Sequence, residues 1–153
     1  MQKITTFLWF DNNAEEAASF YVSVFKNAEI RQITRYGDGA PLPKGTPLTI
    51  SFSLEEQEFV ALNGSEQMSF NTAVSFVVNC ETQEEIDSYW EKLSEGGKEE
   101  ACGWLKDRFG LSWQIVPTLL GSLLNNPDPQ KAQNAMTALL GMKKIDMNAL
   151  VSA

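Results

Sequence analysis

The chain has 153 residues, 43% of them hydrophobic, and a formal net charge of −8. This length suits one domain with a sizeable core, and no apolar run approaches the roughly 20 residues that span a bilayer. Residues 54–100 hold twelve Asp and Glu against two Lys, a balance that argues against nucleic acid and anionic membrane lipid as partners. The N-terminus lacks the charged and apolar regions of a secretory signal, so we expect a cytoplasmic protein.

The absence of histidine removes several kinds of chemistry. No Ser–His or Cys–His nucleophile pair can form, and the commonest transition-metal ligand is missing. The two cysteines, Cys80 and Cys102, lie outside any CxxC arrangement. We expect both to be free thiols in a reducing compartment.

The first part of the chain predicts one strand, one helix and three further strands. Residues 3–10 alternate as a strand that places Thr5, Phe7 and Trp9 on one face. Apolar residues at helical spacing predict a helix over 14–25. Strands are expected near 28–36, 48–54 and 58–62, the last two as a hairpin. The loop 37–45 is rich in Gly and Pro, but its glycines do not follow the GxGxxG phosphate-binding pattern.

The second part predicts the same order of elements after a polar link over residues 63–71. A strand is expected at 72–79 and a helix at 83–93. Short strands follow near 98–100, 102–106 and 111–116. The last two are joined by a turn over residues 107–110, in which Gly110 tolerates a positive φ.

Residues 13–21 and 82–90 share one pattern at a constant offset of 69, since Glu84 corresponds to Glu15. Each copy follows an apolar run and reads as a helix capping box that ends in Glu16 or Glu85. We therefore predict a duplicated βαβββ unit, with module one at 1–63 and module two at 72–117, in a single domain.

The tail over residues 118–153 predicts helices rather than strands. Residues 119–124 are apolar, and Asp128 with Pro129 predicts a cap and first residue of a longer helix. Asp146 is expected to cap a last turn. One face of this tail is apolar, so we expect it to pack on the sheet or on another subunit.

Two stretches make the chain resemble a known family. Residues 9–17 with Phe20 and Tyr21, and more specifically residues 102–114, look like the PhnB-like family of the vicinal-oxygen-chelate superfamily, which includes glyoxalase and bleomycin-resistance proteins. The tail is similar to the family's usual tail. The resemblance implies an α+β fold of two tandem βαβββ modules with curved mixed sheets, and a homodimer.

Members of that family often bear the label 3-demethylubiquinone 3-methyltransferase. A methyltransferase of the usual type needs a parallel sheet with a glycine-rich loop after its first strand, and the sequence predicts neither. We therefore expect that the protein can bear this family label without catalysing methyl transfer.

Active members of the superfamily bind a divalent metal inside each curved sheet. The resemblance puts Gln114 at the position of the last ligand, usually Glu, and Thr5 and Ala73 at two positions often held by His. Ala61, or else Asn63, matches the remaining position. Such side chains do not hold a transition metal, so we expect no metal and no other cofactor.

What remains is a cavity with aromatic walls. We predict that it binds a small, partly apolar molecule through five residues: Phe7, Trp9, Asn63, Trp104 and Gln114. Trp113 is expected to line the same cavity, although all these rings could instead be core. Two alternatives stay open. The protein could be a lyase, isomerase or transferase that recruits Glu58, Glu66 or Cys102, or it could be a structural dimer that acts through a partner.

Overall fold

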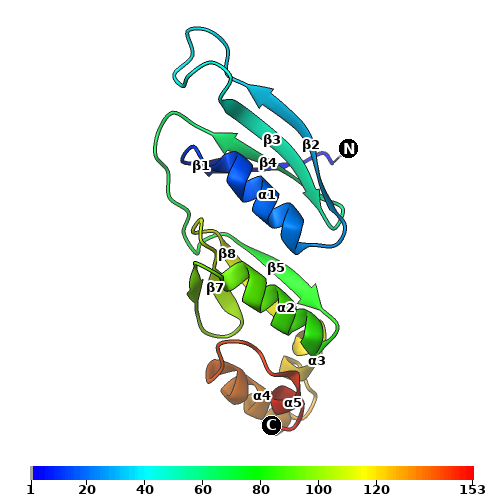
Figure 1. The fold of residues 1–153 in the computed structure, drawn as a ribbon. Helices are drawn as coiled ribbons and strands as arrows, with labels where there is room; N and C mark the ends of the chain where they lie inside the picture. The colour runs from blue at the N-terminus through cyan, green and yellow to red at the C-terminus, as the bar shows by residue number, and fades with distance from the viewer. Residues whose placement is uncertain (1) are drawn as a thin grey trace. The chain divides into compact units, whose positions relative to one another are not determined.

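The same order of elements occurs twice in the computed structural model, which describes residues 2–153 (Figure 1). The first set is β1 (Thr6–Phe10), α1 (Ala14–Val24), β2 (Ala28–Arg35), β3 (Pro47–Leu54) and β4 (Gln57–Asn63). The second set is β5 (Ser75–Cys80), α2 (Gln83–Ser94), β6 (Lys98–Glu99), β7 (Trp104–Lys106) and β8 (Ser112–Pro117). The tail forms α3 (Leu120–Leu124), α4 (Pro129–Leu140) and α5 (Met147–Val151).

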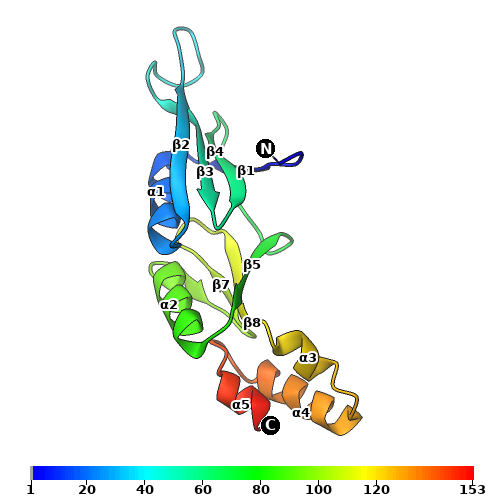
Figure 2. The same ribbon diagram turned by 90° about the vertical axis from the view of Figure 1, so that its right-hand side faces the viewer.

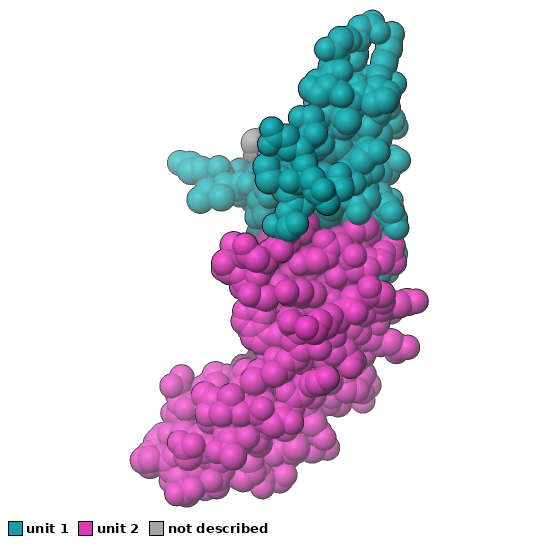
Figure 3. Space-filling view, turned by 90° about the vertical axis from the view of Figure 1, so that its left-hand side faces the viewer, with its two compact units in different colours: residues 1–69 teal, residues 70–153 magenta. Residues whose placement is uncertain are grey.

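Each set builds one four-stranded mixed sheet, and the two sheets have the same topology. The strand orders are β1-β4-β3-β2 and β5-β8-β7-β6. In each sheet the first strand pairs in parallel with the last, and the other pairs are antiparallel. The predicted α+β fold with a repeated βαβββ order is therefore confirmed. The described residues divide into two compact units, residues 1–69 and 70–153, and each is considered by itself (Figure 3).

In the first unit, α1 covers one face of its sheet (Figure 2). The core beneath the helix is aromatic: the Tyr21 ring lies 6.2 Å from that of Phe52, which lies 5.3 Å from that of Phe59. Side chains alternate between the faces of a strand, so Leu8 and Phe10 share this covered face. Phe7 and Trp9 lie on the opposite, open face.

In the second unit, α2 covers one face of the other sheet (Figure 2). Ile86, Trp90 and Leu93 are its buried residues. The helix contacts β7 and β8, in which Leu105 and Trp113 pair with each other and are both buried. The same alternation places Trp104 and Gln114, another registered pair, on the open face.

The tail helices have their own apolar cluster of Leu139, Ile145 and Leu150. Asp128 caps α4 by accepting from the Gln130 amide, with Pro129 at the first position, and Asp146 caps α5 by accepting from the Ala149 amide. Both predicted caps are confirmed. The cluster packs against Cys102 and Val116 of the second unit, so the tail lies against the same unit as the second sheet. No helix among residues 2–153 has both the length and the apolar character needed to cross a membrane.

Some local predictions are wrong: β1 begins at Thr6 rather than at residue 3, and β5 begins at Ser75 rather than at residue 72. The first helix lacks the expected capping box, because the Asn13 side chain makes no cap hydrogen bond and the Asn63 side chain accepts from the Ala14 amide instead. The second helix is capped as expected, with Thr82 accepting from the Glu85 amide. Strand β7 begins at Trp104 rather than Cys102, because Cys102 and Gly103 have φ values of 61° and 84°, which no strand allows.

Candidate functional site

The open face of the first sheet carries two of the predicted ligand residues, Phe7 and Trp9. The Phe7 side chain is 60% exposed. Trp9 is held in place: its indole Nε1 donates to the carbonyl oxygen of Glu66 at 2.8 Å, and its ring occupies the space that a side chain at Gly64 would need. Phe7 is therefore available to a ligand, whereas the polar group of Trp9 already has a partner.

Asn63 does not lie on this open face. Its side chain is buried beneath α1, where Oδ1 accepts from the Ala14 amide at 2.9 Å and Nδ2 donates to the Pro47 carbonyl at 2.9 Å. Its own carbonyl accepts from the Tyr36 hydroxyl. Asn63 thus bonds to three other segments of the first unit and replaces the missing cap of α1. It was predicted to contact a ligand, but it lies on the face of the sheet that α1 covers.

The open face of the second sheet carries the other predicted pair, Trp104 and Gln114. Gln114 Nε2 donates to the Ser75 hydroxyl at 3.0 Å. On the same face by register, Ser112 is fully buried, and its hydroxyl has no hydrogen-bond partner among the described residues. A buried polar atom without a partner is costly, so a water molecule or a ligand atom would stabilise this position.

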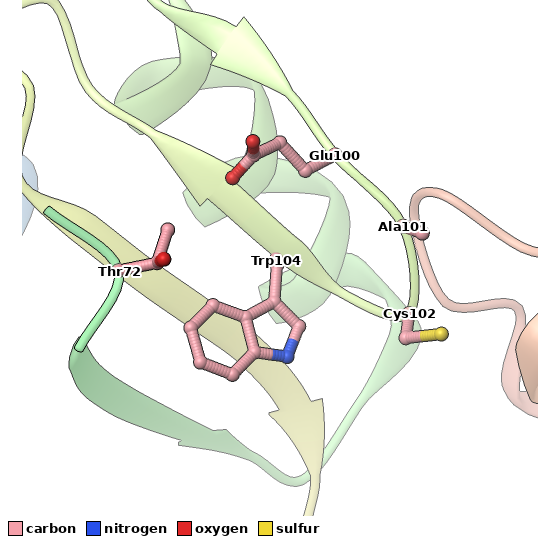
Figure 4. Close-up of a pocket in the computed structure, with 5 residues that line it drawn as sticks. All are labelled: Thr72, Glu100, Ala101, Cys102 and Trp104. Carbon is pink, nitrogen blue, oxygen red and sulfur yellow. The ribbon is translucent and has the colours of Figure 1, made fainter. Parts of the chain in front are cut away.

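Trp104 borders an open hollow of about 390 Å³ in the second unit (Figure 4). Its other lining residues are Thr72, Glu100, Ala101 and Cys102. In Figure 4 the nitrogen edge of the Trp104 indole lies on the side of Cys102. The sequence predicted Trp104 at a binding site and named Cys102 as a candidate for chemistry. It missed Thr72, Glu100 and Ala101, because nothing in their composition distinguishes them from ordinary loop residues.

The indole N–H groups distinguish Trp104 from the other tryptophans. Trp90 donates to Glu99 Oε1 at 2.6 Å, and Trp113 donates to Asp107 Oδ2 at 2.9 Å. Trp9 donates to Glu66, as described above. Within residues 2–153, Trp104 is the tryptophan whose indole N–H has no recorded acceptor. Trp113 is core rather than cavity wall, since it lies on the face covered by α2 and is 3% exposed.

Two of the three residues suggested for an enzymatic role, Glu58 and Glu66, belong to the first unit, and Cys102 belongs to the second. The Glu58 carboxylate accepts from the Gln2 amide, and Glu66 contributes its carbonyl to Trp9. Cys102 lines the hollow beside Trp104. The other thiol, Cys80, is buried. Burial, with a smaller effect of Glu85, raises the pKa of Cys80 to about 12, so this thiol stays protonated at neutral pH.

The residues at the inferred metal positions do not fit a divalent transition metal. Ala61 is fully buried and shares its face with Leu8 and Ile50, so it points toward α1 rather than to the open side. The Gln114 amide is bonded to Ser75, and Thr5 and Ala73 offer no charge. Across residues 2–153, no three His, Cys, Asp or Glu residues gather as a metal site would require.

The family model of 3-demethylubiquinone-9 3-methyltransferase matches residues 2–116. The chain belongs to this family. Among solved structures, a PhnB protein from Bacillus cereus that bears the family's label is 40% identical, with a TM-score of 0.71. The match covers 76% of this chain and all of that one.

More distant structures support the same fold. A Pseudomonas aeruginosa protein has a TM-score of 0.64 at 20% identity, over 76% of this chain and 98% of its own. The fosfomycin resistance protein FosX of Listeria monocytogenes, solved with Mn(II) and sulfate, has a TM-score of 0.55 at 15% identity, over 75% of this chain and 92% of its own. The family member described here thus has the glyoxalase and bleomycin-resistance fold. No curated protein matches it.

The family match ends at residue 116. The tail helices, which the sequence suggested were the family's usual tail, lie outside the matched part of the chain.

Proposed function

We propose that this protein binds a small, planar, mostly apolar molecule without a metal, in the hollow beside Trp104. The free indole N–H of Trp104 carries the proposal, because tryptophan in a buried or half-buried setting normally finds a hydrogen-bond acceptor. Here a ligand would supply that acceptor while its ring stacks on the indole. The Thr72 hydroxyl, also at the hollow, can donate a second hydrogen bond.

The charge of the hollow narrows the class of ligand. Glu100 lines it, and no Lys or Arg does, so an anionic molecule would meet an unfavourable field. A neutral ring that carries carbonyl oxygens suits both the donors and the aromatic wall. The family's description names a quinone, and a benzoquinone ring has these properties.

Methyl transfer is not part of the proposal. The usual methyltransferase holds its cofactor beside a parallel sheet, after a glycine-rich loop. Both sheets of this chain are mixed, and the turn after β1 contains no glycine.

The test uses duroquinone, whose fully substituted ring leaves no free carbon for addition of the Cys102 thiol, and equilibrium dialysis to measure its affinity. We expect Trp104→Phe to keep an aromatic face, although a smaller one, and to lose the N–H donor, whose loss weakens binding up to roughly tenfold, the range for one ordinary hydrogen bond. EDTA should leave the affinity unchanged.

Two controls locate the site. Tetramethylbenzene has a six-membered ring with the same methyl groups but no carbonyl oxygens, so Trp104→Phe should weaken its binding less than that of duroquinone. Phe7→Leu alters the open face of the first sheet instead. If the affinity for duroquinone is unchanged in Trp104→Phe and lower in Phe7→Leu, the binding site lies in the first unit instead. No binding to the wild type would end the proposal for quinone-like ligands.

We also propose that the protein is a homodimer. Large apolar side chains stay exposed in both units: Phe7 at 60%, Val77 at 47% and Leu140 at 65%. A second copy would remove such surface from water. Light scattering at micromolar concentration should report about 34 kDa, twice the 17.0 kDa of the chain. A single species at the mass of one chain would contradict this.

A further inference from the structure

A short segment of the tail is bonded to the loop that forms one wall of the hollow. The Cys102 amide donates to the Met142 carbonyl at 2.8 Å, and the Gly103 amide donates to the Lys143 carbonyl at 2.8 Å. We refer to residues 142–147 as the latch. Cys102 itself lines the hollow, as does Trp104 two residues later in the sequence.

The other side of the latch is held by the first turn of α2. The Gln83 side chain makes two opposed bonds with latch backbone: its Nε2 donates to the Ile145 carbonyl at 3.0 Å, and its Oε1 accepts from the Met147 amide at 2.8 Å. Asp87 orients this amide by accepting from the same Nε2, and it pairs with Lys144 at 2.9 Å. These two partners, Gln83 first, hold the pKa of the Asp87 carboxyl below its usual value.

The loop that contacts the latch has an unusual backbone conformation. Cys102 has a φ of 61°, a conformation that a non-glycine residue adopts only when its surroundings hold it there. Gly103 also has a positive φ, and a Cβ at that position would lie 2.8 Å from Ile145 Cδ1 and 2.9 Å from the Ile115 carbonyl oxygen. Ile145 is fully buried, so the latch packs directly on the loop as well as bonding to it.

We propose that the latch controls the hollow: while Gln83 holds the latch, the loop keeps the strained form that shapes the wall, and release of the latch lowers ligand affinity. This inference rests on the proposed function, since it assigns control of the same hollow. The latch lies outside the part of the chain that the family model matches. The latch would thereby act from the tail on a site within the matched part of the chain.

The test compares Gln83→Leu with Gln130→Leu in the full chain. Both glutamines lie in the first turn of a helix, but Gln130 Nε2 bonds only to Asn134 on the exposed side of α4. Amide hydrogen exchange, followed by NMR, reports the loop without any ligand. In Gln83→Leu we expect the Cys102 and Gly103 amides to exchange roughly tenfold faster, the change expected from the loss of two ordinary hydrogen bonds. Gln130→Leu should leave them unchanged.

The pattern of exchange separates the latch from general destabilisation. The Ile50 and Phe52 amides of the first unit serve as references and should keep their wild-type rates. Equal acceleration at these references, or acceleration at Met147 without any at Cys102 and Gly103, would overturn the inference. Asp87→Asn, which keeps an acceptor for Gln83 but loses the ion pair, should give a smaller change of the same kind.

Ligand binding then tests the control itself. Duroquinone affinity should fall severalfold in Gln83→Leu and stay at the wild-type value in Gln130→Leu. If Gln83→Leu speeds exchange in the loop but leaves the duroquinone affinity unchanged, the latch does not control the hollow. Absence of duroquinone binding to the wild type, with the exchange result intact, would count against the proposed ligand class, and the latch would then have no part in binding it.

Discussion

Replacing Asp107 by asparagine is expected to lower the free energy of unfolding by about 3 kcal/mol, as for other buried and fully bonded polar groups that lose their partners. The Asp107 side chain is 2% exposed and accepts hydrogen bonds at both oxygens: Oδ1 from the Phe109 and Leu111 amides, and Oδ2 from the Trp113 indole. Asparagine has the same shape but only one acceptor atom. Whichever way its amide is turned, an NH₂ group faces an N–H donor.

Urea denaturation followed by tryptophan fluorescence measures this effect. The control is Asp11→Asn, the same change at an exposed aspartate, which we expect to alter stability by less than about 0.5 kcal/mol. A stability of Asp107→Asn equal to that of the control would mean that the turn does not depend on the carboxylate.

Replacing Gly97 by alanine is expected to cost at least about 3 kcal/mol, the upper range for overpacking in a core. The added Cβ would overlap the Lys106 carbonyl oxygen and lie 2.7 Å from the Asp107 carbonyl carbon and 2.9 Å from Asp107 Cα. All three atoms are backbone, so no side chain can rotate away. The pairing of β6 with β7 would have to separate.

Gly121→Ala is the matched control for this substitution. No atom lies within 4 Å of a Cβ at Gly121, which is in α3, so alanine should stabilise the protein by up to about 1 kcal/mol through its helix propensity. Thermal unfolding of the two variants should therefore move in opposite directions. A Gly97→Ala midpoint at or above that of the wild type would show that the backbone accommodates the methyl group.

The helices and their ends were predictable because the signals lie within a few consecutive residues. Helical spacing located α1 and α2 to within a residue at either end, and Asp128 and Asp146 cap as expected. The turn at Gly110 was also predicted, and its φ of 90° agrees. The first helix shows the limit of such signals. Its cap comes from Asn63, 50 residues after Asn13 in the sequence, and a pattern of neighbouring residues does not predict a contact between residues so far apart.

The face on which a strand residue lies was harder to predict. Alternation placed Phe7 and Trp9 together on one face of the first strand, and that face is the open one. Trp104 and Trp113 were expected at the same cavity, but they lie on opposite faces of the second sheet. Ala61 and Asn63 were expected at a metal or ligand site and lie beneath α1 instead. The two residues are two positions apart in β4 and therefore share a face, because each step along a strand reverses the face of the side chain.

The sequence by itself determined the duplicated βαβββ order, the capped helices of the tail, and the lack of imidazole for nucleophile activation or metal binding. Only the tertiary structure decided which aromatic side chains remain free for a ligand. The indole of Trp9 is satisfied by a carbonyl 57 residues away, that of Trp113 by a buried carboxylate, and that of Trp104 by no recorded acceptor within residues 2–153. Whether a donor finds an acceptor depends on atoms that folding brings together, so it cannot be predicted from residue types and their spacing.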